Sequence, residues 1–207
     1  MVKTAAPKAD WREARRQSAR EAIVAAAWAL VEQEGLAGLS LRDLAQRAGI
    51  TTPTVYAHFD SKNAIYDAMF GQAAEQFGAH MSALDATGDA RADLVAELRQ
   101  FAVYCTSNIA RYQLLFQRTI PGFEPSPESY AHAVAALDRI RERLGALGFT
   151  QPRQLDLWTA MGTGLVDQQI SNDPGGDRWL RLIEDAVDMF LAQFPRETPP
   201  KRKRANR

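Results

Sequence analysis

The chain has 207 residues, of which 46% are hydrophobic, and its formal net charge at pH 7 is zero. This length is sufficient for one sizeable core or two small ones. Its one cysteine, Cys105, cannot form an internal disulfide. No paired Cys/His spacing suggests a metal site, so no metal or other cofactor is predicted.

The overall neutrality hides an uneven distribution of charge. Residues 1–20 carry a net charge of +4 and residues 196–207 carry +5, which leaves −9 for the rest of the chain. Phosphate binding needs a basic surface, so the average charge argues against a nucleic-acid partner while the two ends do not. The N-terminus lacks an apolar signal core, and the run AIVAAAWALV is too short to span a bilayer. We therefore expect a cytoplasmic protein with no membrane span.

Prolines are confined to a few clusters, and the stretches between them have apolar residues at spacings of three and four. This pattern predicts an all-α fold. The apolar residues of the first stretch share one helical face: Ile23, Ala27, Leu30 and Val31. That helix is expected to end within GLAGLS, and Ser40 is placed to cap a short second helix over residues 41–48.

A tight turn and a third short helix are predicted at AGITTPTVYAHF. Gly49 supplies the left-handed geometry of the turn, and Thr51 caps a helix in which Pro53 occupies the first turn. Asp60 or Ser61 then caps a fourth helix that begins KNAIYDAMF. No segment of useful length has the alternating pattern of a strand.

Two short helices joined by a glycine turn, with small Ala45 at their crossing, match a helix-turn-helix. Val55 and Phe59 are four residues apart and are expected to point into the core. The other side chains of the second helix then face outward or sideways: Thr52, Thr54, Tyr56, Ala57 and His58. Threonine hydroxyls can bind phosphates or bases, and threonine methyls can contact thymine methyls.

The segment LSLRDLAQRAGITTPTVYAHFDSKNAIYDAM resembles the DNA-binding domain of TetR-family (TetR/AcrR-like) transcription regulators. The resemblance covers roughly residues 15 to 70, because the short helix, the glycine turn, the PTVYAH core and the SK helix start agree in order and spacing. It implies base contacts from Arg42, Thr52 and Thr54. It also implies phosphate contacts from Thr51, Tyr56, His58 and Lys62. It further implies a helical C-terminal domain that binds a ligand and forms the dimer.

We divide the chain into a basic leader at 1–14, a helix-turn-helix domain at 15–62, a ligand-binding and dimerisation domain at 63–195, and a basic disordered tail at 196–207. The basic stretch WREARRQSAR is expected either to run along DNA as an arm or to extend the first helix. The alternative is a solvated helix face. The KRKR tail has no apolar surface to bury, which favours disorder.

Aromatic and sulfur-containing residues of the second half lie at spacings that suit an apolar pocket. The candidates are Phe101, Tyr104, Cys105, Tyr112, Phe116, Phe123, Trp158 and Met161. For each of them the alternative is ordinary core packing. The proline-rich connection over residues 119–129 is long enough to form a pocket rim, or is a plain surface loop.

The last two helices, at about 155–172 and 178–194, are expected to form a homodimer. The first carries Gly162 and Gly164, which permit a close helix crossing, and the second has a wide apolar stripe. An operator palindrome needs two reading heads, which favours a dimer over internal packing of a monomer.

These features predict a homodimeric repressor, and not an enzyme, that binds a palindromic operator and releases it when a small apolar effector fills the pocket. One alternative is a nonspecific DNA-binding protein, which would show little preference between an operator and random duplex. The other is a small helical enzyme that uses Cys105 with His132 or His80, although no supporting motif surrounds these residues.

Overall fold

The computed structural model describes residues 8–194, with side chains from residue 11 onward, and every regular element in that range is helical. The all-α prediction is therefore confirmed. The predicted tail at 196–207 and the first seven residues of the predicted leader lie outside the described residues. The chain divides into two compact units, with boundaries after residues 78, 107 and 134. The predicted boundary after residue 62 lies at the first residue of the helix Lys62–Ser82.

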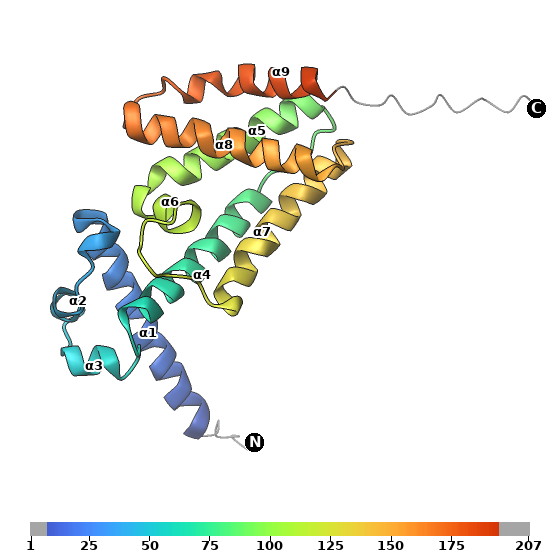
Figure 1. Ribbon diagram of the computed structural model, residues 1–207. Helices are drawn as coiled ribbons and strands as arrows, with labels where there is room; N and C mark the ends of the chain where they lie inside the picture. Colours follow the sequence, from blue (N-terminus) through green and yellow to red (C-terminus); the bar gives the residue numbers. More distant parts are fainter. Residues whose placement is uncertain (1–7, 195–207) are drawn as a thin grey trace, which may run out of the picture. The chain divides into compact units, whose positions relative to one another are not determined.

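Unit 1 comprises residues 8–78 and 108–134 of the described chain. It contains α1 (Lys8–Glu34), a 3-10 turn (Leu36–Gly38), α2 (Leu41–Arg47), α3 (Thr52–Tyr56), most of α4 (Lys62–Ser82), α6 (Ile109–Phe116) and the start of α7 (Pro127–Ala146). Figure 1 shows the short helices α2 and α3 beside α1, and α2 contacts both α1 and α3. The continuous helix α1 means that the described part of the basic stretch extends the first helix.

The core of unit 1 forms from the face of α1 that the sequence predicts, because Ile23, Ala27, Leu30 and Val31 are all buried. The same cluster includes Leu44 and Ala45 of α2, Val55 of α3 and Ile65 and Met69 of α4. Trp28 adds a polar link between helices, since its indole N–H donates to Oε1 of Gln72 at 2.7 Å. The two short helices thus share one apolar core with the two long ones.

A carboxylate on α4 holds the start of α7. Asp67 accepts hydrogen bonds from the backbone N–H of Ser126 at 2.6 Å, from Oγ of Ser126 at 2.9 Å and from Oγ of Ser129 at 3.0 Å. We call this set the Asp67 clasp. One turn further along α4, Gly71 leaves room for α7, because a Cβ there would lie 3.0 Å from Oγ of Ser129. The α6–α7 connection is therefore fixed to α4 at its C-terminal end.

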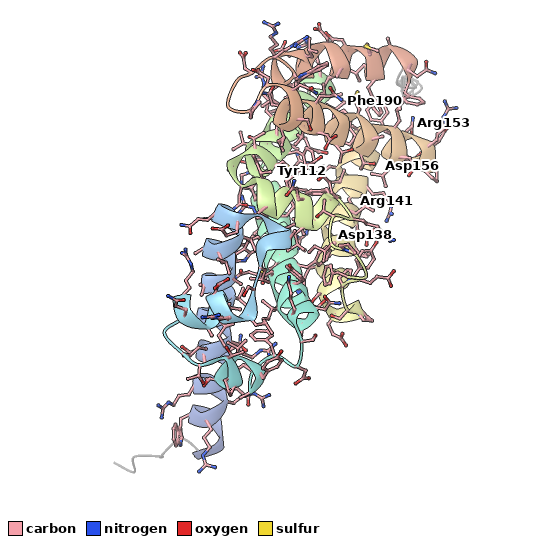
Figure 2. All side chains as sticks on the ribbon, turned by 60° about the vertical axis from the view of Figure 1, so that its left-hand side comes forward. Tyr112, Asp138, Arg141, Arg153, Asp156 and Phe190 are labelled. Carbon is pink, nitrogen blue, oxygen red and sulfur yellow. The ribbon has the colours of Figure 1, made fainter. Side chains whose placement is uncertain are left out.

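Unit 2 comprises residues 79–107 and 135–194 of the described chain. It contains α5 (Ala90–Ser107), the remainder of α7, α8 (Pro152–Asn172), a 3-10 turn (Leu180–Leu182) and α9 (Ile183–Gln193). Helices α5, α8 and α9 contact one another in pairs. Phe190 of α9, labelled in Figure 2, packs its ring against those of Phe149, Trp158 and Phe194 with centroids 5.1–5.2 Å apart.

A buried acid links three elements of unit 2. Glu97 of α5 accepts hydrogen bonds from Nε1 of Trp158 at 2.9 Å and from Nε of Arg143 at 3.0 Å. Arg143 also donates to the carbonyl of Leu84 at 2.9 Å. Burial raises the pKa of Glu97, although the hydrogen bonds from Trp158 and Arg143 oppose that rise. All four residues of this polar network belong to unit 2.

We expect Glu97→Ala to lower the free energy of unfolding by about 2–4 kcal/mol, because it leaves a buried indole N–H and a partly buried guanidinium without their acceptor. Urea titration measures the loss. A matched control is Glu184→Ala, which removes an exposed carboxylate paired with Arg91 and Arg99 and should cost no more than about 1 kcal/mol. Equal losses in the two variants would contradict the assigned role of Glu97.

Candidate nucleic-acid interface

The turn between α2 and α3 is built by caps at both helix starts. Oγ of Ser40 accepts from the backbone N–H of Asp43 at 3.4 Å, and Oγ1 of Thr51 accepts from that of Thr54 at 3.3 Å. Gly49 has φ of 67°, a left-handed conformation in which a side chain would be strained. The predicted cap, glycine turn and proline-containing first helical turn are thus present in the structure.

Helix α3 is held by its apolar side and exposes the other. Val55 is 0% exposed and Phe59 is 2% exposed, whereas Tyr56 is 51% exposed. The other predicted DNA contacts fall into two groups. Three are exposed: Arg42, Thr51 and Thr54. Three are half-buried: Thr52, His58 and Lys62. The structure therefore gathers the predicted residues around α2, α3 and the start of α4, with Tyr56 the most prominent aromatic side chain.

The threonines at the start of α3 also bond to each other. The hydroxyls of Thr51 and Thr54 are 2.8 Å apart, and Thr51 already accepts from the N–H of Thr54. The hydroxyl of Thr51 is therefore partly committed to capping, while the methyl groups of both residues remain available for apolar contact with a thymine methyl.

Arg20, the last residue of the basic stretch WREARRQSAR, positions the end of α3. The guanidinium of Arg20 donates to the carbonyl of His58 and lies 4.1 Å from the centroid of the Phe59 ring. Basic side chains commonly satisfy the last carbonyls of a helix, so this role follows from chemistry but not from sequence spacing. Nδ1 of His58 is buried without a hydrogen-bond partner among the described residues.

Tyr66 joins α4 to the segment that precedes α2. It is almost fully buried, and its hydroxyl donates to the carbonyl of Leu36 in the 3-10 turn. Burial raises the pKa of Tyr66 to about 12, so the phenol stays protonated and can donate. The Nζ of Lys62, a predicted phosphate contact, lies 5.5 Å from the centroid of the Tyr66 ring.

The predicted pocket residues are distributed between the two units. In unit 2, Phe101, Tyr104, Cys105 and Trp158 are buried and Met161 is half-buried. In unit 1, Tyr112 is buried, while Phe116 and Phe123 line a cavity of about 580 Å³. Within the described residues, no cluster of His, Cys, Asp and Glu could hold a metal ion. No described helix is both long and apolar enough to cross a membrane.

This fold and turn define a protein with the helix-turn-helix of DNA-binding regulators. Residues 23–69 match the sequence model of the family described as "Bacterial regulatory proteins, tetR family". Residues 23–69 are therefore similar to this family, which confirms the resemblance seen in the sequence.

The sequence relatives match over this domain. The class D tetracycline repressor protein of Escherichia coli is 44% identical over 50 residues, which are 24% of this chain and 23% of that protein. The class H protein of Photobacterium damsela subsp. piscicida matches to the same extent. The chain therefore spans about a quarter of the length of these relatives.

Solved structures resemble a larger part of the chain. A protein of unknown function from Rhodococcus sp. RHA1 has a TM-score of 0.70 at 23% identity, with 84% of this chain and 94% of that one covered. The transcriptional regulator FadR from Bacillus subtilis, solved with stearoyl-CoA, has a TM-score of 0.64 at 16% identity, with 83% and 97% covered. At these identities the likeness establishes the fold.

The raised pKa of Tyr66 predicts a pH dependence. Since the folded-state pKa of about 12 lies above the ordinary value of 10.0, the stabilisation from the buried phenol is complete below pH 10 and is lost as the pH rises through 12. Urea titrations across this range should show a smaller fall in unfolding free energy for Tyr66→Phe than for the wild type. Parallel pH profiles for the two proteins would contradict this assignment.

Proposed function

We propose that this protein is a transcriptional regulator that binds a palindromic operator as a homodimer and releases it when a small apolar ligand binds. The observation that carries the proposal is the surface of α3, where Thr54 and Tyr56 are exposed while Val55 and Phe59 fix the helix from behind. A helix held in this way can enter a major groove with its outer face against base edges. The family match over residues 23–69 supports the same role.

Charge on this surface also supports DNA binding. Arg42 is exposed on α2, and Arg12, Arg15 and Arg16 are exposed on the first turns of α1. None of these four arginines forms an ion pair with another described residue within 4.0 Å. Guanidinium groups of this kind can neutralise phosphates locally. Binding to DNA therefore does not require a positive net charge on the whole chain, whose net charge is zero.

Helices α8 and α9 supply a surface for self-association. Leu157 on α8 is 45% exposed and Met189 on α9 is 73% exposed. Exposed apolar side chains on two adjacent helices are suited to burial against a second copy, and a twofold dimer would present two α3 helices to one duplex. The two heads would then lie about 34–36 Å apart, or a small multiple of this distance, to reach successive major grooves.

Ligand control is supported by the cavity in unit 1 and by the structure of FadR, a protein of the same fold that was solved in complex with stearoyl-CoA, whose acyl chain is apolar. A nonspecific DNA-binding protein is the second candidate, since exposed arginines alone would also give phosphate binding.

The enzyme alternative depends on Cys105. This residue is fully buried, so it is poorly placed to attack a substrate.

For the reading head, we expect Arg42→Ala or Thr54→Ala to weaken operator binding by about 1–3 kcal/mol more than random-duplex binding, because each removes a side chain that reads a base edge. Lys62→Ala should weaken both about equally and reduce the slope of log K against log salt by about 1, because one phosphate is no longer neutralised. Fluorescence anisotropy over a salt series measures both effects, with an operator selected from a random DNA pool.

If the wild type binds the selected and random duplexes equally at fixed salt, the nonspecific alternative holds and the operator proposal fails. If Arg42→Ala weakens both DNAs equally, Arg42 contacts phosphate and does not read a base.

For the dimer, we expect Met189→Asp to shift the protein toward monomer, because a charge would be buried at the interface. Sedimentation velocity over a concentration series measures the shift. Val103→Asp is a matched control, since Val103 is 59% exposed on α5. A dimer that is unaffected by Met189→Asp, or equally weakened by both changes, would contradict the α8–α9 interface.

A further inference from the structure

The cavity in unit 1 has the size of a small-molecule site. Its volume is about 580 Å³, and its walls come from α4, α6, the α6–α7 connection and the start of α7. Small-molecule sites commonly measure about 300–1,000 Å³ and are lined mainly by apolar and aromatic groups. Four aromatic rings line this one: Phe70, Phe116, Phe123 and Tyr130. The rings of Phe70 and Tyr130 are nearly parallel, with an interplanar angle of 22°.

The charged groups of the lining favour an uncharged ligand. Arg118 and Glu124 are the charged residues of the lining, and they have opposite signs. Both are exposed, so they lie at the solvent side of the cavity. The lining therefore has no net charge to attract an ion, while its aromatic rings can stack on a planar apolar molecule.

One face of α4 is tied to the wall of this cavity. Nδ2 of Asn63 contacts the carbonyl of Gly122 at 3.5 Å, Tyr66 packs on Phe123 with ring centroids 5.8 Å apart, and the Asp67 clasp holds Ser126. Phe70 lines the cavity itself. These four positions follow the i, i+3, i+4, i+7 spacing of a single helical face. In Figure 1 the α6–α7 connection crosses α4 between the end of α6 and the start of α7.

The same face of α4 leads to the helix-turn-helix. Tyr66 contacts Phe123 of the cavity wall through its ring and the carbonyl of Leu36 through its hydroxyl. Leu36 belongs to the 3-10 turn, four residues before the cap of α2 at Ser40. A displacement of Phe123 by a ligand would therefore press on a residue that is hydrogen-bonded to the entry of the reading head. All of these residues belong to unit 1.

We propose that the effector site is this cavity, that it takes an uncharged, planar aromatic molecule, and that Tyr66 transmits its occupancy from Phe123 to the segment entering α2. The gene-regulatory meaning of the site rests on the function proposed above. The site itself and the response of the head do not require DNA. Tyr66 is a positioning residue in this scheme, because its hydroxyl group acts through Leu36.

Nile red, an uncharged planar aromatic dye, is the probe for the site. We expect the full-length protein to bind it with a saturable rise in fluorescence, and Phe123→Ala to weaken binding about tenfold or more. Tyr130→Ala should also weaken binding, and because Tyr130 is exposed this change leaves the core intact. Phe149→Ala is the matched control, since it removes a buried ring of unit 2 that packs on Phe190. Circular dichroism checks that each variant is folded.

A dye affinity that falls in Met161→Ala but not in Phe123→Ala or Tyr130→Ala would place the site in unit 2 and overturn the proposal. Equal losses in Phe149→Ala and Phe123→Ala would also overturn it, because they would indicate a general effect of destabilisation.

Hydrogen exchange measured by mass spectrometry tests the transmission. Saturating dye should change the exchange rate of amides in residues 36–47 of the wild type. Tyr66→Phe keeps the ring against Phe123 and should retain the dye affinity to within about twofold. In that variant the exchange response of residues 36–47 should be lost, because the link to Leu36 is absent. A wild-type response of zero, or an undiminished response in Tyr66→Phe, would overturn the role of Tyr66.

These measurements separate this site from the regulatory function. If the wild type shows no preference for any DNA sequence while the dye and exchange results hold, the operator function fails and the site stands. If operator binding is specific but the dye lowers it equally in wild type and Phe123→Ala, the function stands and this site is wrong.

Discussion

The orientation of α3 depends on contacts made by residues outside its exposed face. A helix of five residues, Thr52–Tyr56, cannot hold its own shape in water, since isolated helices shorter than about 12 residues are marginal. Val55 and Phe59 fix it to the apolar core, and Arg20 binds the carbonyl of His58 just beyond its end. The exposed threonines and tyrosine can therefore present a fixed pattern only because α1 and α4 supply a rigid support. The geometry of the exposed surface of α3 therefore depends on the core.

Helix α4 connects three features of unit 1. Ile65 and Met69 contribute to the core, Tyr66 reaches the entry of α2, and Asp67 and Phe70 contact the α6–α7 region. Because all of these positions belong to one helix, a small rotation of α4 would affect the core, the segment entering α2 and the cavity together. Packed interiors respond to such changes as discrete rearrangements, since their density leaves little room for gradual adjustment.

The sequence was sufficient to predict the elements that depend on local chemistry. The caps at Ser40 and Thr51, the left-handed Gly49 and the buried pair Val55 and Phe59 follow from residue type and spacing of four or fewer. The predicted face of α1 is buried for the same reason. The exposure of Tyr56 follows once its neighbours on the helix are assigned to the core.

Contacts between distant segments could not be predicted in the same way. Arg20 and His58 are 38 positions apart, and Asp67 and Ser126 are 59 apart. Nothing in their local sequence distinguishes them from other surface residues. The residues that line the cavity could not be predicted from the sequence either, because the spacing of aromatic residues along one helix does not reveal which rings meet across helices. Trp158 fitted the pocket pattern, yet its indole N–H binds Glu97 in the network of unit 2.

Gly71 allows α4 and α7 to approach closely, because the space at this position is too small for a side chain to fit without a shift of its neighbours. The Oγ of Ser129, which a Cβ at this position would approach to 3.0 Å, is itself held by Asp67 and cannot rotate away without losing that bond. The space available at Gly71 therefore depends on the hydrogen bond between Ser129 and Asp67. Even the single methyl group of alanine would require Ser129 to move by a few tenths of an ångström or to give up its bond to Asp67, so the close approach of α4 and α7 depends on the absence of one carbon atom.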